Sequence, residues 1–101
     1  MIKILIKTEG NKFVSMQVKG HANSAPHGED LVCAGVSSVL TGGLNSLKEI
    51  DKFEIKLDEG NSYIKVKEEI SFHDEVVIET IINSLKTIEE SYGQFIKIEN
   101  L

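Results

Sequence analysis

One short stretch of the 101-residue sequence carries most of the side chains that can do chemistry. The segment GHANSAPHGEDLVCAGVSS, residues 20–38, holds the only cysteine, Cys33, and two of the three histidines, His21 and His27. A thiolate is a strong nucleophile and an imidazole can accept its proton, so a cysteine and a histidine held together can attack a carbonyl carbon. The pattern is therefore compatible with nucleophilic catalysis by Cys33, with a histidine as its base, and also with Cys33 as a small core residue, which is the commoner role of a lone cysteine.

Asp30 lies directly before an apolar run and carries a side chain well suited to capping a helix. A helix that begins at Leu31 has Cys33 in its first turn, where free backbone N–H groups and the helix dipole favour a thiolate. The N–H groups of Val32, Cys33 and Ala34 are then candidate donors to an oxyanion. Asp30 is also a candidate to orient the imidazole, and the sequence leaves open whether it caps, orients or does both.

His21 is the favoured base, because the end of a strand fixes its position, whereas His27 lies in the middle of a loop. Residues 22–29 are rich in small side chains and are predicted to form a movable cover over the site. Ser37 lies one helical turn beyond Cys33 on the same face, where its hydroxyl can contact the sulfur or the substrate.

Other uses of these residues fit the pattern less well. Zinc needs three or four ligands, and Cys33, His21 and His27 lack the CxxC or HxxxH spacing of zinc sites. No glycine-rich stretch has the spacing of a phosphate-binding loop. We therefore predict no metal and no cofactor. The remaining alternative is that Cys33 is a small core residue of a protein that binds without catalysis.

Hydrophobic periodicity predicts the elements that position these residues, with alternation indicating strands and helical spacing indicating helices. The predicted strands are 2–7, 13–19, 53–57, 63–67 and 95–98. The predicted helices are 31–47 and a second one from Ser71 or Asp74 to about Tyr92. Turns at 8–11 and 58–61 join the strands into two hairpins. The order β-β-α-β-β-α-β predicts one α+β domain, 1–101, with two helices packed on a mixed or antiparallel sheet of undetermined strand order.

Three glycines and one histidine in or near the helices carry further expectations. Gly42 and Gly43 fall inside the first helix, at a cost of up to about 1 kcal/mol each relative to alanine. Either the helix bends there or the glycines permit close contact with a second helix. Gly93 is predicted to be a left-handed C-terminal cap. His73 is predicted to be a surface or capping residue.

Composition excludes several classes of protein. Hydrophobic residues make up 41% of the chain, as in folded domains. Apolar stretches are far shorter than the roughly 20 residues of a membrane-spanning helix, and no signal peptide is recognisable, so a cytoplasmic location and no membrane partner are expected. The net charge of −5 argues against a nucleic-acid partner and is compatible with a basic protein partner.

The segment GHA, followed by an acidic, glycine-containing loop and then DLVCAGVS, resembles the ribosomal-processing cysteine protease (Prp) family. The match is specific at residues 20–37, and the length and element order agree along the whole chain. The resemblance implies Cys33 as nucleophile and His21 as base, and His27 is not part of the motif. The further positions that match the motif are Gly20, Asp30 and Ser37.

The resemblance also implies a function. Members of the family are small homodimeric cytoplasmic endopeptidases. The implied substrate is the precursor of large-subunit ribosomal protein twenty-seven, whose short N-terminal extension is removed by cleavage after a pair of aromatic residues. The alternative is a non-catalytic ribosome-assembly or peptide-binding module in which Cys33 is structural.

Overall fold

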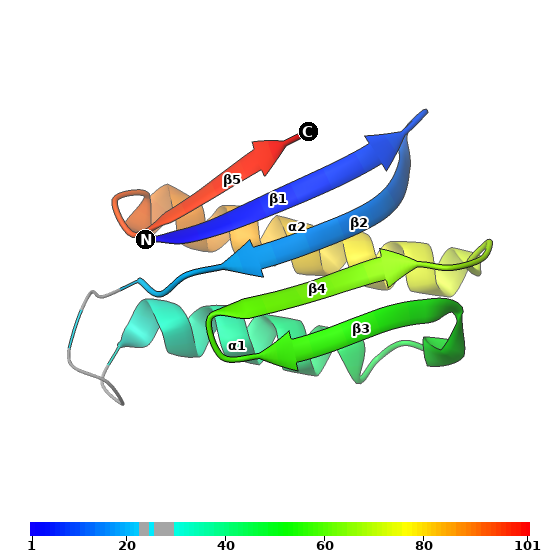
Figure 1. Cartoon of the computed structure of the whole chain (residues 1–101), viewed down its shortest axis with the longest axis horizontal. Coiled ribbons are helices and arrows are strands. Elements are labelled where there is room, and N and C mark those ends of the chain that lie inside the picture. Colours follow the sequence, from blue (N-terminus) through cyan, green and yellow to red (C-terminus); the bar gives the residue numbers. More distant parts are fainter. Residues whose placement is uncertain (23–24, 26–29) are drawn as a thin grey trace.

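The computed structural model describes residues 1–22, 25 and 30–101, and its elements follow the predicted order (Figure 1). The strands are β1 (Ile2–Glu9), β2 (Lys12–Lys19), β3 (Phe53–Asp58), β4 (Asn61–Val66) and β5 (Ile96–Asn100). The α-helices are α1 (Leu31–Leu44) and α2 (Phe72–Tyr92), and a short 3-10 helix, η1, spans Ile50–Lys52. The predicted α+β class and element order are confirmed.

In the described part of the chain the strands form one mixed sheet in the order β3-β4-β2-β1-β5. Neighbouring strands are antiparallel except β1 and β5, which are parallel. Both helices lie behind the sheet in Figure 1, so the opposite face of the sheet is open. The pairing of β2 with β4 brings the turn between β3 and β4 to the end of β2.

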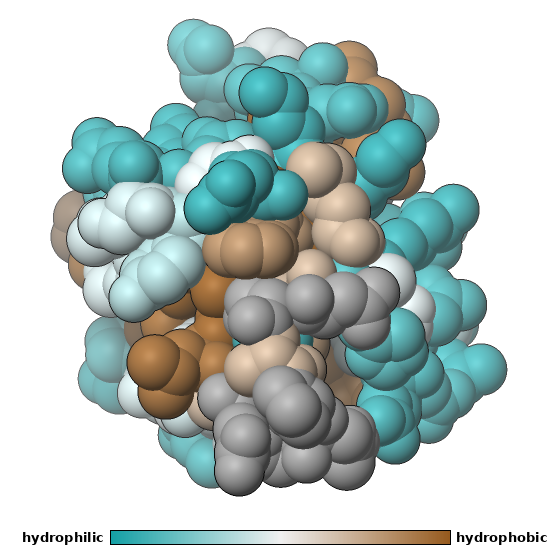
Figure 2. All heavy atoms as spheres, turned by 90° about the vertical axis from the view of Figure 1, so that its left-hand side faces the viewer, coloured by the Kyte–Doolittle hydropathy of each residue, from teal (hydrophilic) through white to brown (hydrophobic). Residues whose placement is uncertain are grey.

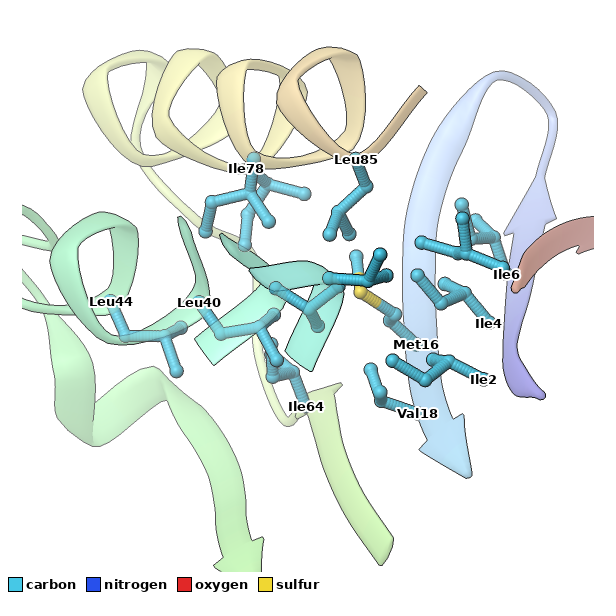
Figure 3. Close-up of a cluster of buried hydrophobic side chains, with 14 of the residues drawn as sticks. Ile2, Ile4, Ile6, Met16, Val18, Leu40, Leu44, Ile64, Ile78 and Leu85 are labelled. Carbon is cyan, nitrogen blue, oxygen red and sulfur yellow. The ribbon is translucent and has the colours of Figure 1, made fainter. Parts of the chain in front are cut away.

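The core lies between the sheet and the two helices (Figure 3). Side chains on the inner face of the strands meet apolar stripes of α1 and α2, and burying each such side chain contributes about 1.5–3 kcal/mol. The core members labelled in Figure 3 are Ile2, Ile4, Ile6, Met16, Val18, Leu40, Leu44, Ile64, Ile78 and Leu85. None of the described helices is long and apolar enough to cross a membrane.

The two glycines of α1 have different surroundings. A Cβ at Gly43 would collide with the side chain of Ile81 on α2, lying 2.6 Å from its Cδ1, whereas a Cβ at Gly42 would meet nothing within 4 Å. Close helix contact is therefore confirmed for Gly43, and the second helix belongs to the same chain. α1 ends at Leu44 rather than at residue 47, and Ser46 donates its N–H to the Gly43 carbonyl at 2.9 Å.

The start of α2 is anchored to the segment that follows α1. Ser71 is the cap, because its hydroxyl accepts the Asp74 N–H at 3.2 Å. Asp74 is fully buried, and its two carboxylate oxygens accept the N–H groups of Lys48 and Glu49 at 2.9 and 3.0 Å. These bonds fix α2 relative to the chain between α1 and β3.

The prediction of a left-handed cap at Gly93 is wrong. Gly93 has φ −58 and ψ −16, a right-handed conformation, and the Phe95 N–H donates to the Tyr92 carbonyl at 2.8 Å. The chain thus turns tightly from the helix into β5. His73 is exposed, as predicted, and its Nε2 lies 3.0 Å from the Ser46 carbonyl oxygen.

The contact at Gly43 predicts opposite effects of the same substitution at adjacent positions. Gly43→Ala should destabilise the protein by about 1–3 kcal/mol, because an added methyl overpacks the contact with Ile81. Gly42→Ala should stabilise it by about 0.5–1 kcal/mol, because alanine favours the helix and meets no neighbour. Urea unfolding of both variants measures these changes, and equal effects would contradict the close contact.

Candidate active site

A cleft of about 640 Å³ opens at the end of the molecule where β2 ends and α1 begins. Its described walls include the end of β2, the first turns of α1 and the turn between β3 and β4. Figure 2 views this end and shows hydrophobic residues exposed there. Leu31, the first residue of α1, is 73% exposed. The cleft therefore combines polar groups with apolar surface.

Asp30 caps α1, as predicted. Its Oδ1 accepts the N–H groups of Val32 and Cys33 at 3.0 and 3.1 Å, and its backbone oxygen accepts the Ala34 N–H at 3.0 Å. Cys33 consequently lies in the first turn of the helix. The same three N–H groups are the predicted oxyanion donors, and in this conformation each of them donates to Asp30.

The sulfur of Cys33 contacts the chain just beyond β2. The backbone N–H of Ala22 donates to Cys33 Sγ at 3.4 Å. Ala22 is only 3% exposed and belongs to the core, so it is not part of a movable cover. The hydrogen bond joins the strand end to the helix start through the thiol itself.

His21 is exposed and lies against the turn between β3 and β4. A Cβ at Gly60 would be 2.8 Å from His21 Nε2, so the imidazole occupies the space that glycine leaves. The Gly20 N–H also donates to the Gly60 carbonyl at 2.9 Å. This turn thus contacts both the backbone before His21 and the ring itself.

Gly20 meets two requirements that exclude a side chain. Its φ of +88 lies in the region that favours glycine, and a Cβ there would collide with the backbone oxygen of Met1. The backbone of Met1 therefore occupies the space that a side chain at this position would need. The chain can turn at this point only because the residue is glycine.

The predicted catalytic residues share one cleft, but the imidazole and the thiol are not hydrogen-bonded to each other. Cys33, His21, Asp30 and Ser37 all line it. Within the described residues, no hydrogen bond joins His21 to Cys33 or to Asp30, and Ser37 makes none to the sulfur. Asp30 therefore caps the helix in this conformation.

Most of the predicted cover lies outside the described part of the chain. Ala25 lines the cleft, while residues 23–24 and 26–29 are outside the described residues. The rival base, His27, is among them. The described residues contain no cluster of three or more His, Cys, Asp or Glu side chains that could hold a metal.

The turn between β3 and β4 is the part of the site that sequence reasoning missed. Asp58, Glu59, Gly60 and Asn61 all line the cleft. The residue types predict the turn itself, and Gly60 has the positive φ, +78, that such a turn requires. Its role at the site depends on the pairing of β2 with β4, for which the sequence has no local signal.

Comparison with known proteins identifies the family. The family described as cysteine protease Prp matches residues 1–97. The chain belongs to this family. It is 36% identical to the ribosomal processing cysteine protease Prp of Bacillus subtilis (strain 168), over 97% of this chain and 96% of the relative. It is 31% identical to the Staphylococcus aureus (strain Mu50) protease of the same name, over 96% and 94% of the two chains.

A solved Prp structure shares the fold. The S. aureus ribosomal processing protease Prp, in complex with a covalently linked product peptide, superposes with a TM-score of 0.91 at 30% identity. The match covers 100% of both chains. The family and the fold agree that this chain is a cysteine protease, and Cys33 is its only cysteine.

The contact between Gly60 and His21 predicts that Gly60→Ala lowers peptidase activity by about 10- to 100-fold, because the added methyl displaces the imidazole. Gly10→Ala is the matched control: Gly10 also has a positive φ, +51, in a hairpin turn, but a Cβ there meets nothing within 4 Å. Both substitutions place alanine at a positive φ and so strain the backbone, but only Gly60→Ala displaces the imidazole. Kinetic assays of the two folded variants therefore separate the effect of strain from the effect of displacement. Equal activities would contradict a positioning role for the turn.

Proposed function

We propose that this cysteine protease removes the short N-terminal extension of the precursor of large-subunit ribosomal protein twenty-seven, cleaving after a pair of aromatic residues. The observation that carries the proposal is the placement of Cys33, in the first turn of α1, and His21, at the end of β2, in one cleft. The Prp relatives of B. subtilis and S. aureus are named ribosomal processing proteases, which supports this choice of substrate class.

In the proposed reaction the sulfur of Cys33 attacks the scissile carbonyl carbon. His21 accepts the thiol proton and donates it to the leaving amine, which leaves a thioester on Cys33. Water then attacks the thioester with His21 as base, which releases the new carboxylate and restores the thiol. Catalytic hydrogen bonds often tighten only when substrate binds, so the absence of a direct bond from His21 to Cys33 here is compatible with these roles.

A covalent intermediate is supported by the S. aureus relative, which has been solved with a covalently linked product peptide. The tetrahedral intermediate that precedes the thioester carries an oxyanion, which needs backbone N–H donors. The Ala22 N–H is already directed at Cys33 Sγ, so it lies beside the atom that attacks the carbonyl carbon. We add it to the predicted donors, because Val32 and Cys33 can contribute theirs only if Asp30 releases them.

The lining of the cleft supports a substrate with both apolar and basic side chains. Its described apolar walls and the exposed Leu31 offer surface to aromatic residues, whose burial contributes strongly to binding. Three carboxylates line it and no described lysine does. Asp58 is paired with Lys56 at 3.3 Å, and Asp30 caps α1. The acidic lining favours a positively charged peptide.

We also infer that the protein is a cytoplasmic homodimer, as the family resemblance implies. Gly42 and Gly43 of α1 were predicted to permit close contact with a second helix, which a second copy of the chain could supply. Gly43 is covered by Ile81 of the same chain, whereas Gly42 meets nothing within 4 Å. A dimer contact through this helix would therefore involve the side of α1 on which Gly42 lies.

The proposal predicts that Cys33→Ala lowers cleavage of the purified precursor by at least about 10³-fold, because the nucleophile is lost. Ser38→Ala is a suitable control, because Ser38 is exposed on the same helix and does not line the cleft. Mass spectrometry of the products measures the extent and position of cleavage, and circular dichroism checks the fold. Full cleavage by Cys33→Ala would contradict the proposal, and binding without cleavage by the wild type would favour the non-catalytic module.

A further inference from the structure

The open face of the sheet carries three lysines side by side on adjacent strands. Lys3 on β1 lies opposite Lys19 on β2 and opposite Lys97 on β5. Their neighbours along the strands, Ile2 and Ile96 among them, are buried in the core, so the lysines point to the face that no helix covers (Figure 1). All three are exposed. We call Lys3, Lys19 and Lys97 the lysine row.

The lysine row is not ion-paired among the described residues, although the same face carries the acidic side chains of Asp58 on β3 and Glu99 on β5. None of its members forms an ion pair within 4.0 Å there, although Lys56 on the same face is paired with Asp58. The nearest acidic position on β5, Glu99, lies opposite Leu5 rather than opposite a lysine. Like charges directly opposite on adjacent strands destabilise a sheet, so this arrangement is favoured only when something neutralises it.

The lysine row lies at the end of the sheet that carries the active site. Lys19 directly precedes Gly20 and His21, and on its other side it lies opposite Asn61, which lines the cleft. The row is about 10 Å wide, given a strand spacing of about 4.8 Å. A partner on the open face can therefore bind close to the cleft without entering it.

The next row on the same face offers groups that contact bases. Gln17 lies opposite Tyr63 on β4, and both are partly exposed. An open sheet face that combines cations with an aromatic ring is one of the ways in which proteins bind single-stranded RNA, through phosphate contacts and base stacking.

We propose that the lysine row and Tyr63 bind single-stranded RNA. The positive charge of the lysine row does not depend on the proposed reaction. The choice of RNA over another polyanion rests on the proposed function, which concerns a ribosomal protein precursor. The net charge of −5 made a nucleic-acid partner unexpected, because an average over the whole chain conceals the local excess of positive charge on this face. The overall negative charge keeps the binding weak.

Fluorescence anisotropy of a labelled single-stranded RNA of about 12 nucleotides tests the proposal. The Cys33→Ala protein is used, so the result does not depend on proteolysis. Affinity should lie in the weak range of about 10⁻⁴ to 10⁻⁶ M, and three phosphate contacts predict a slope of log K against log salt of about −2. The triple variant Lys3→Gln, Lys19→Gln, Lys97→Gln should lose at least about tenfold in affinity.

The matched control is the triple variant Lys48→Gln, Lys52→Gln, Lys86→Gln. It changes the net charge equally at positions outside the sheet and should lose less than about twofold. Tyr63→Leu should weaken binding by at least about fivefold, because stacking on the ring is lost. Absence of binding by the wild-type surface, equal losses in the two triple variants, or preferential displacement of the RNA by polyglutamate would overturn the proposal.

Discussion

The hydrogen bond from the Ala22 N–H to Cys33 Sγ is the contact on which the geometry of the site depends. It holds the end of β2 against the first turn of α1, although residues 23–24 and 26–29 between them are outside the described structure. The bond requires the chain to turn sharply after β2, which the positive φ of Gly20 permits. It also requires α1 to begin at a fixed residue, which the Asp30 cap ensures.

The two halves of the chain contribute different parts of the site. The first half supplies the thiol, the imidazole and the cap, and the second supplies the turn on which the imidazole rests. Gly60 positions His21 in two ways. Its carbonyl accepts the Gly20 N–H, and its lack of a side chain leaves space for the imidazole ring. A substitution in this turn therefore acts on catalysis through His21, although the turn contains no residue predicted to react.

The features that the sequence predicts correctly are those with a local cause. Asp30 precedes an apolar run and caps the helix regardless of what the helix packs against. The turns that contain Gly and Asn appear where predicted, because these residue types tolerate positive φ. The close contact of Gly43 remained one of two alternatives, because only the packing of α1 on α2 decides it. The cap at Gly93 is wrong because the tight turn into β5 overrides the usual preference of glycine.

The features that escaped prediction depend on contacts between distant residues. The strand order decides that the turn at Gly60 meets His21, and no local pattern encodes the pairing of β2 with β4. Likewise, the N–H that donates to the Cys33 sulfur belongs to Ala22, which the sequence places in a movable cover. Net charge likewise contains no information about which face of the sheet carries the lysines.

The central claim is that His21 activates Cys33, and the most direct test is the rate of iodoacetamide labelling of Cys33 at neutral pH. An activated thiol reacts faster than a free one, so the wild type should be labelled at least about tenfold faster than His21→Ala. His27→Ala should be labelled at the wild-type rate. A labelling rate that depends on His27, or on neither histidine, would contradict the assignment of His21 as the base.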